Sequence, residues 1–187
     1  STLQASQTNM VASAINAPPA IRSAGGVTIS DIYVQLMWPC ADGYASITVL
    51  FGPALGPFTR NLMEWIFEEG FCDEATRDKD WLNYGELIFS GQEPVSEYDR
   101  VKRVIGEFCA TKTKAELFEE AFVRRLLIAP VTTAEDVLNN PHLTERGIWE
   151  DIQIGDRLVR FPGRMAIFSE TPQKPLPQPP TIGEHTA

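Results

Sequence analysis

Few side chains in this 187-residue sequence could perform nucleophilic or metal chemistry. Three cysteines, Cys40, Cys72 and Cys109, lie far apart with no C-x-x-C spacing, and the two histidines are His142 and His185. A zinc site needs closely spaced cysteine and histidine ligands, so we expect no metal site. We interpret the cysteines as the reduced thiols of a cytoplasmic protein and both histidines as surface or capping residues.

No glycine-rich or metal-binding signature accompanies these residues. The sequence contains no G-x-G-x-x-G, no G-x-x-x-x-G-K-[ST] and no H-E-x-x-H. A serine or cysteine nucleophile needs a base within reach, and two histidines leave little choice of one. The residue types alone therefore name no reaction, no catalytic residue and no cofactor-binding residue.

Charge is distributed unevenly along the chain. The sequence holds 25 acidic and 16 basic residues, a net charge of -9, and residues 61–99 alone hold eleven acidic and two basic ones. This balance argues against a nucleic-acid binder, because phosphate contacts need a basic surface. The acidic stretch is either a docking face for a basic partner or a solvated helix surface with an acidic loop. The more basic residues 100–125 could assist an anionic ligand or be ordinary helix-surface charges.

Strands are the first elements that the sequence predicts to position these groups. Runs rich in β-branched and aromatic residues predict strands over residues 27–38, 44–51, 126–131, 148–154 and 157–161. Turn residues at Asp42-Gly43 and Gly155-Asp156 join four of these runs into two β-hairpins, because glycine readily adopts the positive φ that tight turns need.

Apolar residues at helical spacing predict amphipathic helices over residues 56–69 and 98–108 and after residue 113. Thr113 and Glu116 match a capping box at the start of the third helix. Its predicted apolar face consists of Leu117, Phe118, Ala121 and Phe122. One more short helix is predicted from residue 132 to about 140, whereas residues 71–94 show only a weak pattern, with a helical turn at 81–84.

The two ends differ in composition from the middle. Residues 1–17 are small and uncharged, which predicts a helix ended by Pro18-Pro19 or else a poorly ordered terminus. Five prolines between residues 172 and 180 predict a stiff, extended tail. No run approaches the ~20 apolar residues that a bilayer span requires, and the start lacks the features of a secretory signal, so we expect a cytoplasmic protein without a membrane segment.

Several short motifs occur in an order that is similar to that of a known family. Residues 38–44 have the pattern W-x-x-x-D-G-Y, residues 127–131 read LIAPV, residues 140–147 read NPHLTERG, and residues 169–172 and 183–186 read SETP and GEHT. With the T…E helix of residues 111–121, this order resembles the C-terminal half of the family III CoA-transferases, the CaiB/BaiF family, which includes formyl-CoA transferase and α-methylacyl-CoA racemase.

The resemblance implies a small α+β domain with antiparallel hairpins and amphipathic helices at residues 27–168. It implies that residues 1–26 are a helix and linker from a large domain, and that residues 169–187 are a Pro-rich tail returning to that domain. It also implies an acyl-CoA:carboxylate CoA-transferase that works through an aspartyl-acyl anhydride and an aspartyl-CoA thioester. Coenzyme A thioester would be the substrate, with no tightly bound cofactor, and the chains would form interlinked dimers.

The same resemblance places the nucleophilic aspartate in an N-terminal half that has no counterpart in this sequence. Asp31 and Asp42 belong to the first predicted hairpin, so neither receives the catalytic role. We expect the chain alone to be inactive and to need an N-terminal half or partner subunit, in a homo- or hetero-oligomer. Two alternatives stay open: a non-catalytic binding or scaffold module that uses its acidic face for protein contact, and the half-chain of an acyl-CoA racemase.

Overall fold

The computed structural model describes residues 21–23, 25–29, 32–163, 166–172, 174, 177–180 and 182–184. The helix predicted over residues 1–17 lies outside the described residues, as do Asp31 and His185. The chain divides into two compact units, one up to Val131 and one from Thr132 onward. The predicted boundaries after residues 26 and 168 refer to a large domain and stay predictions.

The strands in the described residues of the first unit form two antiparallel sheets. The first sheet has the order β1 (Ile21–Ser23), β2 (Gly26–Ile29), β3 (Ile32–Gln35), and the second has the order β4 (Met37–Cys40), β5 (Gly43–Ile47), β6 (Ile128–Pro130). The prediction of one strand over residues 27–38 is therefore wrong. The chain reverses between β2 and β3 and breaks again before β4, where the Gly25 carbonyl accepts hydrogen bonds from both Leu36 N and Met37 N.

The predicted hairpin turn before Gly43 is confirmed. Cys40 pairs with Gly43 across the β4–β5 hairpin, and Gly43 has a φ of 147°, in the region that favours glycine. The backbone N–H of Ala41 donates to the Lys112 carbonyl at 2.8 Å, so the turn packs on the connection between two helices far along the chain.

The described residues of the first unit also form α2 (Gly56–Glu68), α3 (Glu74–Arg77), α4 (Tyr84–Phe89), α5 (Val95–Ala110) and α6 (Lys114–Arg124). The three predicted amphipathic helices are confirmed as α2, α5 and α6. The helix α2 carries Pro57 in its first turn, where the missing N–H costs nothing. In the weakly patterned residues 71–94, α3 begins at an Asp73 cap that accepts from Thr76 N at 2.9 Å, and α4 begins only at Tyr84.

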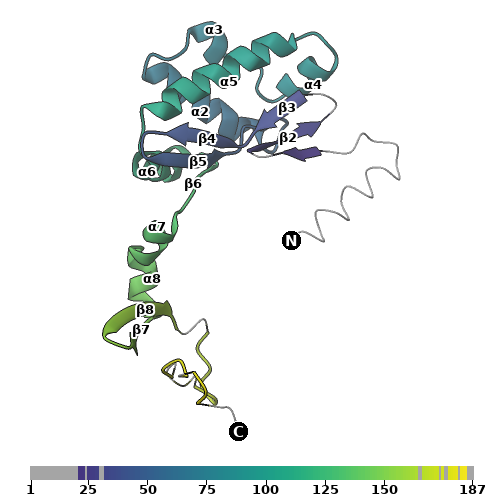
Figure 1. Ribbon diagram of the computed structural model, residues 1–187. Helices are drawn as coiled ribbons and strands as arrows, with labels where there is room; N and C mark the ends of the chain where they lie inside the picture. The colour runs from purple at the N-terminus through teal and green to yellow at the C-terminus, as the bar shows by residue number, and fades with distance from the viewer. Residues whose placement is uncertain are drawn as a thin grey trace. The chain divides into compact units, whose positions relative to one another are not determined.

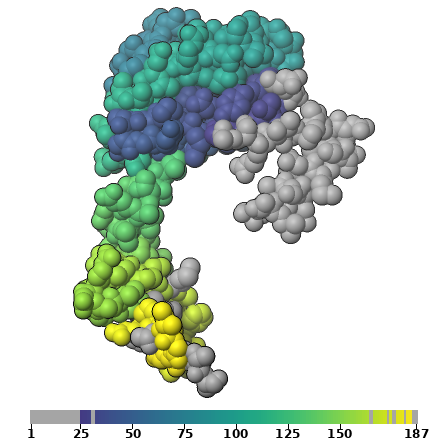
Figure 2. All heavy atoms as spheres, viewed as in Figure 1, coloured from purple at the N-terminus to yellow at the C-terminus, as the bar shows by residue number. Residues whose placement is uncertain are grey.

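The core of the first unit lies between the helices and the strands. Figure 2 shows the strands as a layer beneath α3, α4 and α5, and Figure 1 shows α5 crossing above β4 and α6 at the lower side of the strands. A Cβ built on Gly106 of α5 would lie 3.8 Å from the Trp38 ring of β4, an ordinary van der Waals contact, so this face of the helix packs on the strand. The largest fully buried side chains are aromatic: Trp38, Trp81, Tyr84, Tyr98 and Phe108.

The apolar face of α6 differs from its prediction. Leu117 and Ala121 are buried, whereas Phe118 and Phe122 are 40% and 72% exposed. Successive residues of a helix are rotated by about 100°, so the two phenylalanines form a separate stripe beside the buried one. Their rings contact each other edge to face, with centroids 4.9 Å apart.

The described part of the second unit contains α7 (Ala134–Leu138), α8 (Pro141–Glu145) and the hairpin of β7 (Trp149–Ile154) and β8 (Arg157–Pro162). The hairpin and the helix at residues 132–140 are confirmed. The helix α8 follows the predicted helix, and the Asn140 side chain caps it by accepting a hydrogen bond from Leu143 N at 3.2 Å.

The described residues after 163 contain no helix or strand. The extended tail that the prolines predict stays a prediction. Across the described parts of the chain the fold is α+β with antiparallel hairpins, as predicted. None of their helices is long and apolar enough to cross a bilayer.

Candidate functional site

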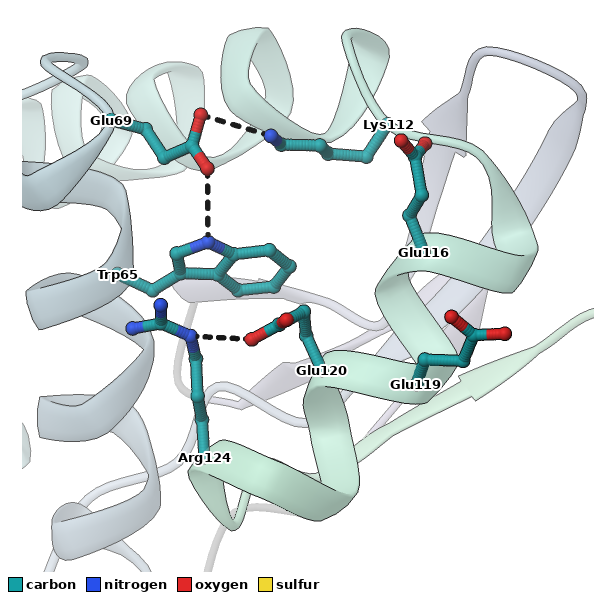
Figure 3. Close-up of a pocket in the computed structure, with 7 residues that line it drawn as sticks. All are labelled: Trp65, Glu69, Lys112, Glu116, Glu119, Glu120 and Arg124. Carbon is teal, nitrogen blue, oxygen red and sulfur yellow. Dashed lines mark hydrogen bonds and ion pairs between the residues drawn. The ribbon is translucent and has the colours of Figure 1, made fainter.

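A polar cavity of about 220 Å³ lies between α2, α6 and the residues that follow α5 (Figure 3). Acidic side chains outnumber basic ones in its wall, which is lined by Trp65, Glu69, Lys112, Glu116, Glu119, Glu120 and Arg124. This excess of carboxylates disfavours the phosphate groups of a nucleotide such as CoA.

The buried Trp65 indole organises the ion pairs of this cavity, as Figure 3 shows. Its Nε1–H donates to Glu69 Oε1 at 3.3 Å, and the other oxygen of Glu69 lies 2.9 Å from Lys112 Nζ. Arg124 lies 5.3 Å from the centroid of the indole ring and pairs through Nε with Glu120 at 2.7 Å. Both cations near the ring therefore already have carboxylate partners.

The pKa of Glu69 lies below its ordinary value, first because Lys112 donates a hydrogen bond to it. Arg124 also reaches back to α2, where its Nη1 lies 2.6 Å from Glu68 Oε2. These pairs connect α6 and the end of α5 to the last turn of α2. The arrangement is that of a structural ion-pair cluster, with no nucleophile–base pair among the residues that line it.

A second ion-pair network ties α5 to the segment before it. Lys79 Nζ lies 2.6 Å from Glu93 and 3.1 Å from Glu97, and the Tyr84 hydroxyl donates to Glu93 at 3.0 Å. Arg100 donates two hydrogen bonds to Glu97, at 2.8 and 2.7 Å, which together with Lys79 lower the Glu97 pKa to about 2. The pKa of Tyr84 is raised, first by burial and then by its bond to Glu93.

These contacts join the acidic stretch of residues 61–99 to the more basic stretch of residues 100–125. Acidic residues of the 61–99 stretch pair with basic residues of the 100–125 stretch, as in Glu68–Arg124, Glu69–Lys112 and Glu97–Arg100. Each such pair at the surface adds only about 0–1 kcal/mol, but together they reduce the charge that either stretch offers to a partner. The structure therefore favours internal pairing over a docking face or an anion site.

Asp42 is held by contacts that belong to the fold. Its Oδ1 accepts from the backbone N–H of Lys114 at 2.7 Å, at the start of α6, and the Cys40 thiol lies 3.6 Å from the same oxygen. A carboxylate that accepts a hydrogen bond from the first turn of a helix in this way is fixed in position.

The cysteines and the described histidine show no catalytic arrangement. Burial raises the pKa of Cys109 to about 12, and burial also raises the pKa of Cys40 and Cys72. Thiols of this kind stay protonated and poorly nucleophilic near neutral pH. His142 is an exposed residue of α8. Within the described ranges no group of three or more His, Cys, Asp or Glu could hold a metal ion.

One feature of the first unit was not predicted from the sequence. A wide apolar pocket of about 620 Å³ lies between the β5–α2 loop and α4, and it shares no lining residue with the cavity of Figure 3. The glycines at positions 52 and 56 were the available signal: Gly52 has a φ of 92°, and a Cβ built on Gly56 would lie 2.9 Å from Leu82 Cα, so glycine lets the two backbone segments approach each other.

Comparison with known proteins identifies relatives of this chain. The family model for CoA-transferase family III matches residues 2–186. The chain is 29% identical to the protein named succinyl-CoA:(R)-benzylsuccinate CoA-transferase subunit BbsE of Thauera aromatica. The alignment spans 169 residues, which are 88% of this chain and 38% of that protein.

The fold is similar to a CAIB/BAIF family protein from Brucella suis, with a TM-score of 0.56 and 20% identity over 80% of this chain and 34% of that one. It is also similar to Rv3272 from M. tuberculosis, with a TM-score of 0.50 and 17% identity over 81% of this chain and 38% of that one. The chain thus spans 34% to 38% of the length of these relatives. Since the family model covers nearly every residue, the chain belongs to CoA-transferase family III.

Proposed function

We propose that this chain is the C-terminal part of an acyl-CoA:carboxylate CoA-transferase, and that the nucleophilic aspartate belongs to the rest of that enzyme. The observation that carries the proposal is the family match over residues 2–186. The chain covers only 38% of the length of BbsE, which is consistent with a share of a larger catalytic unit.

In the proposed reaction, an aspartate carboxylate attacks the carbonyl carbon of the acyl-CoA thioester. The C–S bond breaks, CoA leaves as a thiolate, and an aspartyl-acyl anhydride forms. The thiolate attacks the aspartyl carbonyl carbon, which releases the donor acid as a carboxylate and leaves an aspartyl-CoA thioester. The acceptor carboxylate attacks this thioester in turn, and the released thiolate attacks the acyl carbon of the new anhydride. The products are the new acyl-CoA and the free aspartate.

The contacts of this chain support a nucleophile located elsewhere. Asp42 is occupied by its bond to Lys114 N, and in the polar cavity Lys112 and Arg124 pair with carboxylates of the same unit. Groups that are already paired contribute little to binding the phosphates of CoA. In this proposal the remaining part of the enzyme supplies both the nucleophile and most of the CoA site.

The proposal requires a partner for this chain, either fused to it or separate. The relative BbsE is named as a subunit, which supports assembly from more than one chain. We propose that the partner is an N-terminal CoA-transferase half, in a homo- or hetero-oligomer. The location in the cytoplasm stays a prediction from the sequence.

The test measures CoA transfer by the 187-residue chain alone and after co-expression with the N-terminal part of the enzyme. Succinyl-CoA and (R)-benzylsuccinate, taken from the name of BbsE, are the first substrate pair, and chromatography quantifies the product thioester. We expect no transfer by the chain alone and turnover by the pair, lost when the nucleophilic aspartate of the partner becomes asparagine. Turnover by the chain alone would contradict the proposal. A stable but inactive complex would favour a non-catalytic module.

A further inference from the structure

The apolar pocket of the first unit has walls from two segments of the chain. The β5–α2 loop contributes Leu50, Phe51 and Leu55, and the segment that enters and forms α4 contributes Leu82 and Phe89. Its volume of about 620 Å³ lies within the ~300–1,000 Å³ range of small-molecule sites, which are mostly lined by apolar and aromatic groups.

The backbone of the pocket is held in place before any ligand arrives. Gly52 N donates to the Leu82 carbonyl at 2.8 Å, and Gly56 N donates to the Gly52 carbonyl at 2.7 Å. The buried Thr59 hydroxyl donates to the Leu50 carbonyl at 2.6 Å. A loop pinned at three points loses little conformational entropy on binding, so the pocket is preorganised.

The Phe51 ring is fixed by the aromatic core. Its centroid lies 5.1 Å from Tyr84 and 5.9 Å from Tyr98, both in edge-to-face contact, and 6.5 Å from Trp81. A Cβ built on Gly85 would lie 3.3 Å from the Phe51 ring, so the glycine lets α4 close against it. On the other wall Phe89 is 60% exposed, which leaves a large aromatic surface uncovered.

The charges of the pocket select against anions. Glu86 is the only residue with a formal charge among those that line it. The other strongly polar side chain, Asn83, donates its amide to Asp80 at 2.8 Å. No cation of the lining compensates a carboxylate or phosphate, so a negatively charged group would meet Glu86 at a cost.

We propose that this pocket binds an uncharged aromatic ring of a small molecule. The ring packs against Phe51 and Phe89 with the offset or edge-to-face geometry that aromatic pairs prefer, while any anionic part of the ligand stays outside. The aryl end of an acyl group and a free aromatic compound share this chemistry. The site depends on contacts within the first unit alone, so it stands or falls separately from the transferase proposal.

The first experiment titrates the 15N-labelled 187-residue chain with benzyl alcohol and, separately, with benzoate. We expect saturable shifts at the backbone amides of Gly52 and Gly85, and an affinity about tenfold lower for benzoate. A third titration uses phenylacetyl-CoA. Shifts at the same two amides would show that the pocket accepts the aryl end of an acyl group. If benzyl alcohol causes these shifts and phenylacetyl-CoA does not, the ligand is a free aromatic compound. Lack of saturable shifts with benzyl alcohol would overturn the proposal and leave the apolar surface to a protein partner.

Substitutions test the exposed aromatic wall of the pocket and its charge separately. Phe89→Ala should weaken benzyl alcohol binding by about fivefold or more, because it removes an apolar wall that is exposed and therefore dispensable for folding. The matched control Phe122→Ala, at an exposed phenylalanine of α6, should leave it unchanged. Glu86→Gln should strengthen benzoate binding several-fold and leave benzyl alcohol unaffected. Equal losses in the two phenylalanine variants would contradict the site.

Discussion

The carboxylate of Asp42 accepts a hydrogen bond of 2.7 Å from the backbone N–H of Lys114, 72 positions further along the chain. This bond fastens the β4–β5 turn to the first turn of α6. It satisfies one of the N–H groups that the start of a helix leaves without an intrahelical partner.

We therefore expect Asp42→Ala to lower the free energy of unfolding by about 1–2 kcal/mol, measured by urea denaturation with tryptophan fluorescence. Asp42→Asn keeps an acceptor oxygen and should cost less. In the reconstituted transferase both variants should retain turnover per folded molecule. A well-folded Asp42→Asn variant without turnover would show that Asp42 takes part in the chemistry.

The Glu97 network predicts a pH dependence of stability. The folded-state pKa of about 2 lies below the ordinary value of 4.5, so ionised Glu97 stabilises the fold above pH 4.5. This contribution is lost as the pH falls from about 4.5 towards 2. Glu97→Gln should therefore destabilise the chain by roughly 1–3 kcal/mol at pH 6, and the difference from the parent should shrink across that window.

The matched control for this measurement is Glu107→Gln, an exposed glutamate on the same helix. Its stability should follow that of the parent within about 0.5 kcal/mol over the whole pH range. A difference for Glu97→Gln that stays constant from pH 6 to pH 2 would contradict the role of its ionised form.

The buried stripe and the exposed stripe of α6 predict that truncating their side chains lowers the free energy of unfolding by different amounts. Leu117→Ala removes a fully buried side chain and should cost about 2–5 kcal/mol, whereas Phe122→Ala, at a residue that is 72% exposed, should cost less than about 0.5 kcal/mol. Denaturant unfolding of both variants checks the difference. Comparable costs would mean that Phe122 is covered in the protein in solution.

The cysteines should differ in reactivity. Burial raises the pKa of Cys109 to about 12 and leaves its side chain inaccessible, so a thiol reagent at pH 8 should modify it only after unfolding. Cys40 and Cys72 are partly exposed and should react earlier in the native chain. Mass spectrometry of timed samples measures each site. Rapid modification of Cys109 without denaturant would refute its burial.

Local sequence signals predicted the elements whose determinants are close in sequence. The capping box of Thr113 and Glu116 forms both of its hydrogen bonds, and the Asp42-Gly43 pair marks the hairpin turn. Such features depend on a few adjacent residues and on backbone conformations that only certain residues favour.

Features that depend on distant contacts were not predictable in the same way. The reversal between β2 and β3 is set by pairing, as in Val27 with Val34, inside a run that is dominated by β-branched and aromatic residues. The exposure of Phe122 depends on which stripe of α6 meets β5 and β6. The apolar pocket needs Gly52 and Leu82 to meet, and no local pattern specifies that contact.

The pairing of the 61–99 and 100–125 stretches also has a consequence for synthesis of the protein. Glu68 and Glu69 leave the ribosome before their partners Arg124 and Lys112, which follow 56 and 43 positions later. During that interval α2 carries carboxylates that repel one another and lacks the cations that later lie over its Trp65 ring. These contacts of α2 are completed only with α6, and β6 pairs with β5 later still, so the first unit is expected to complete its fold only after β6 has emerged.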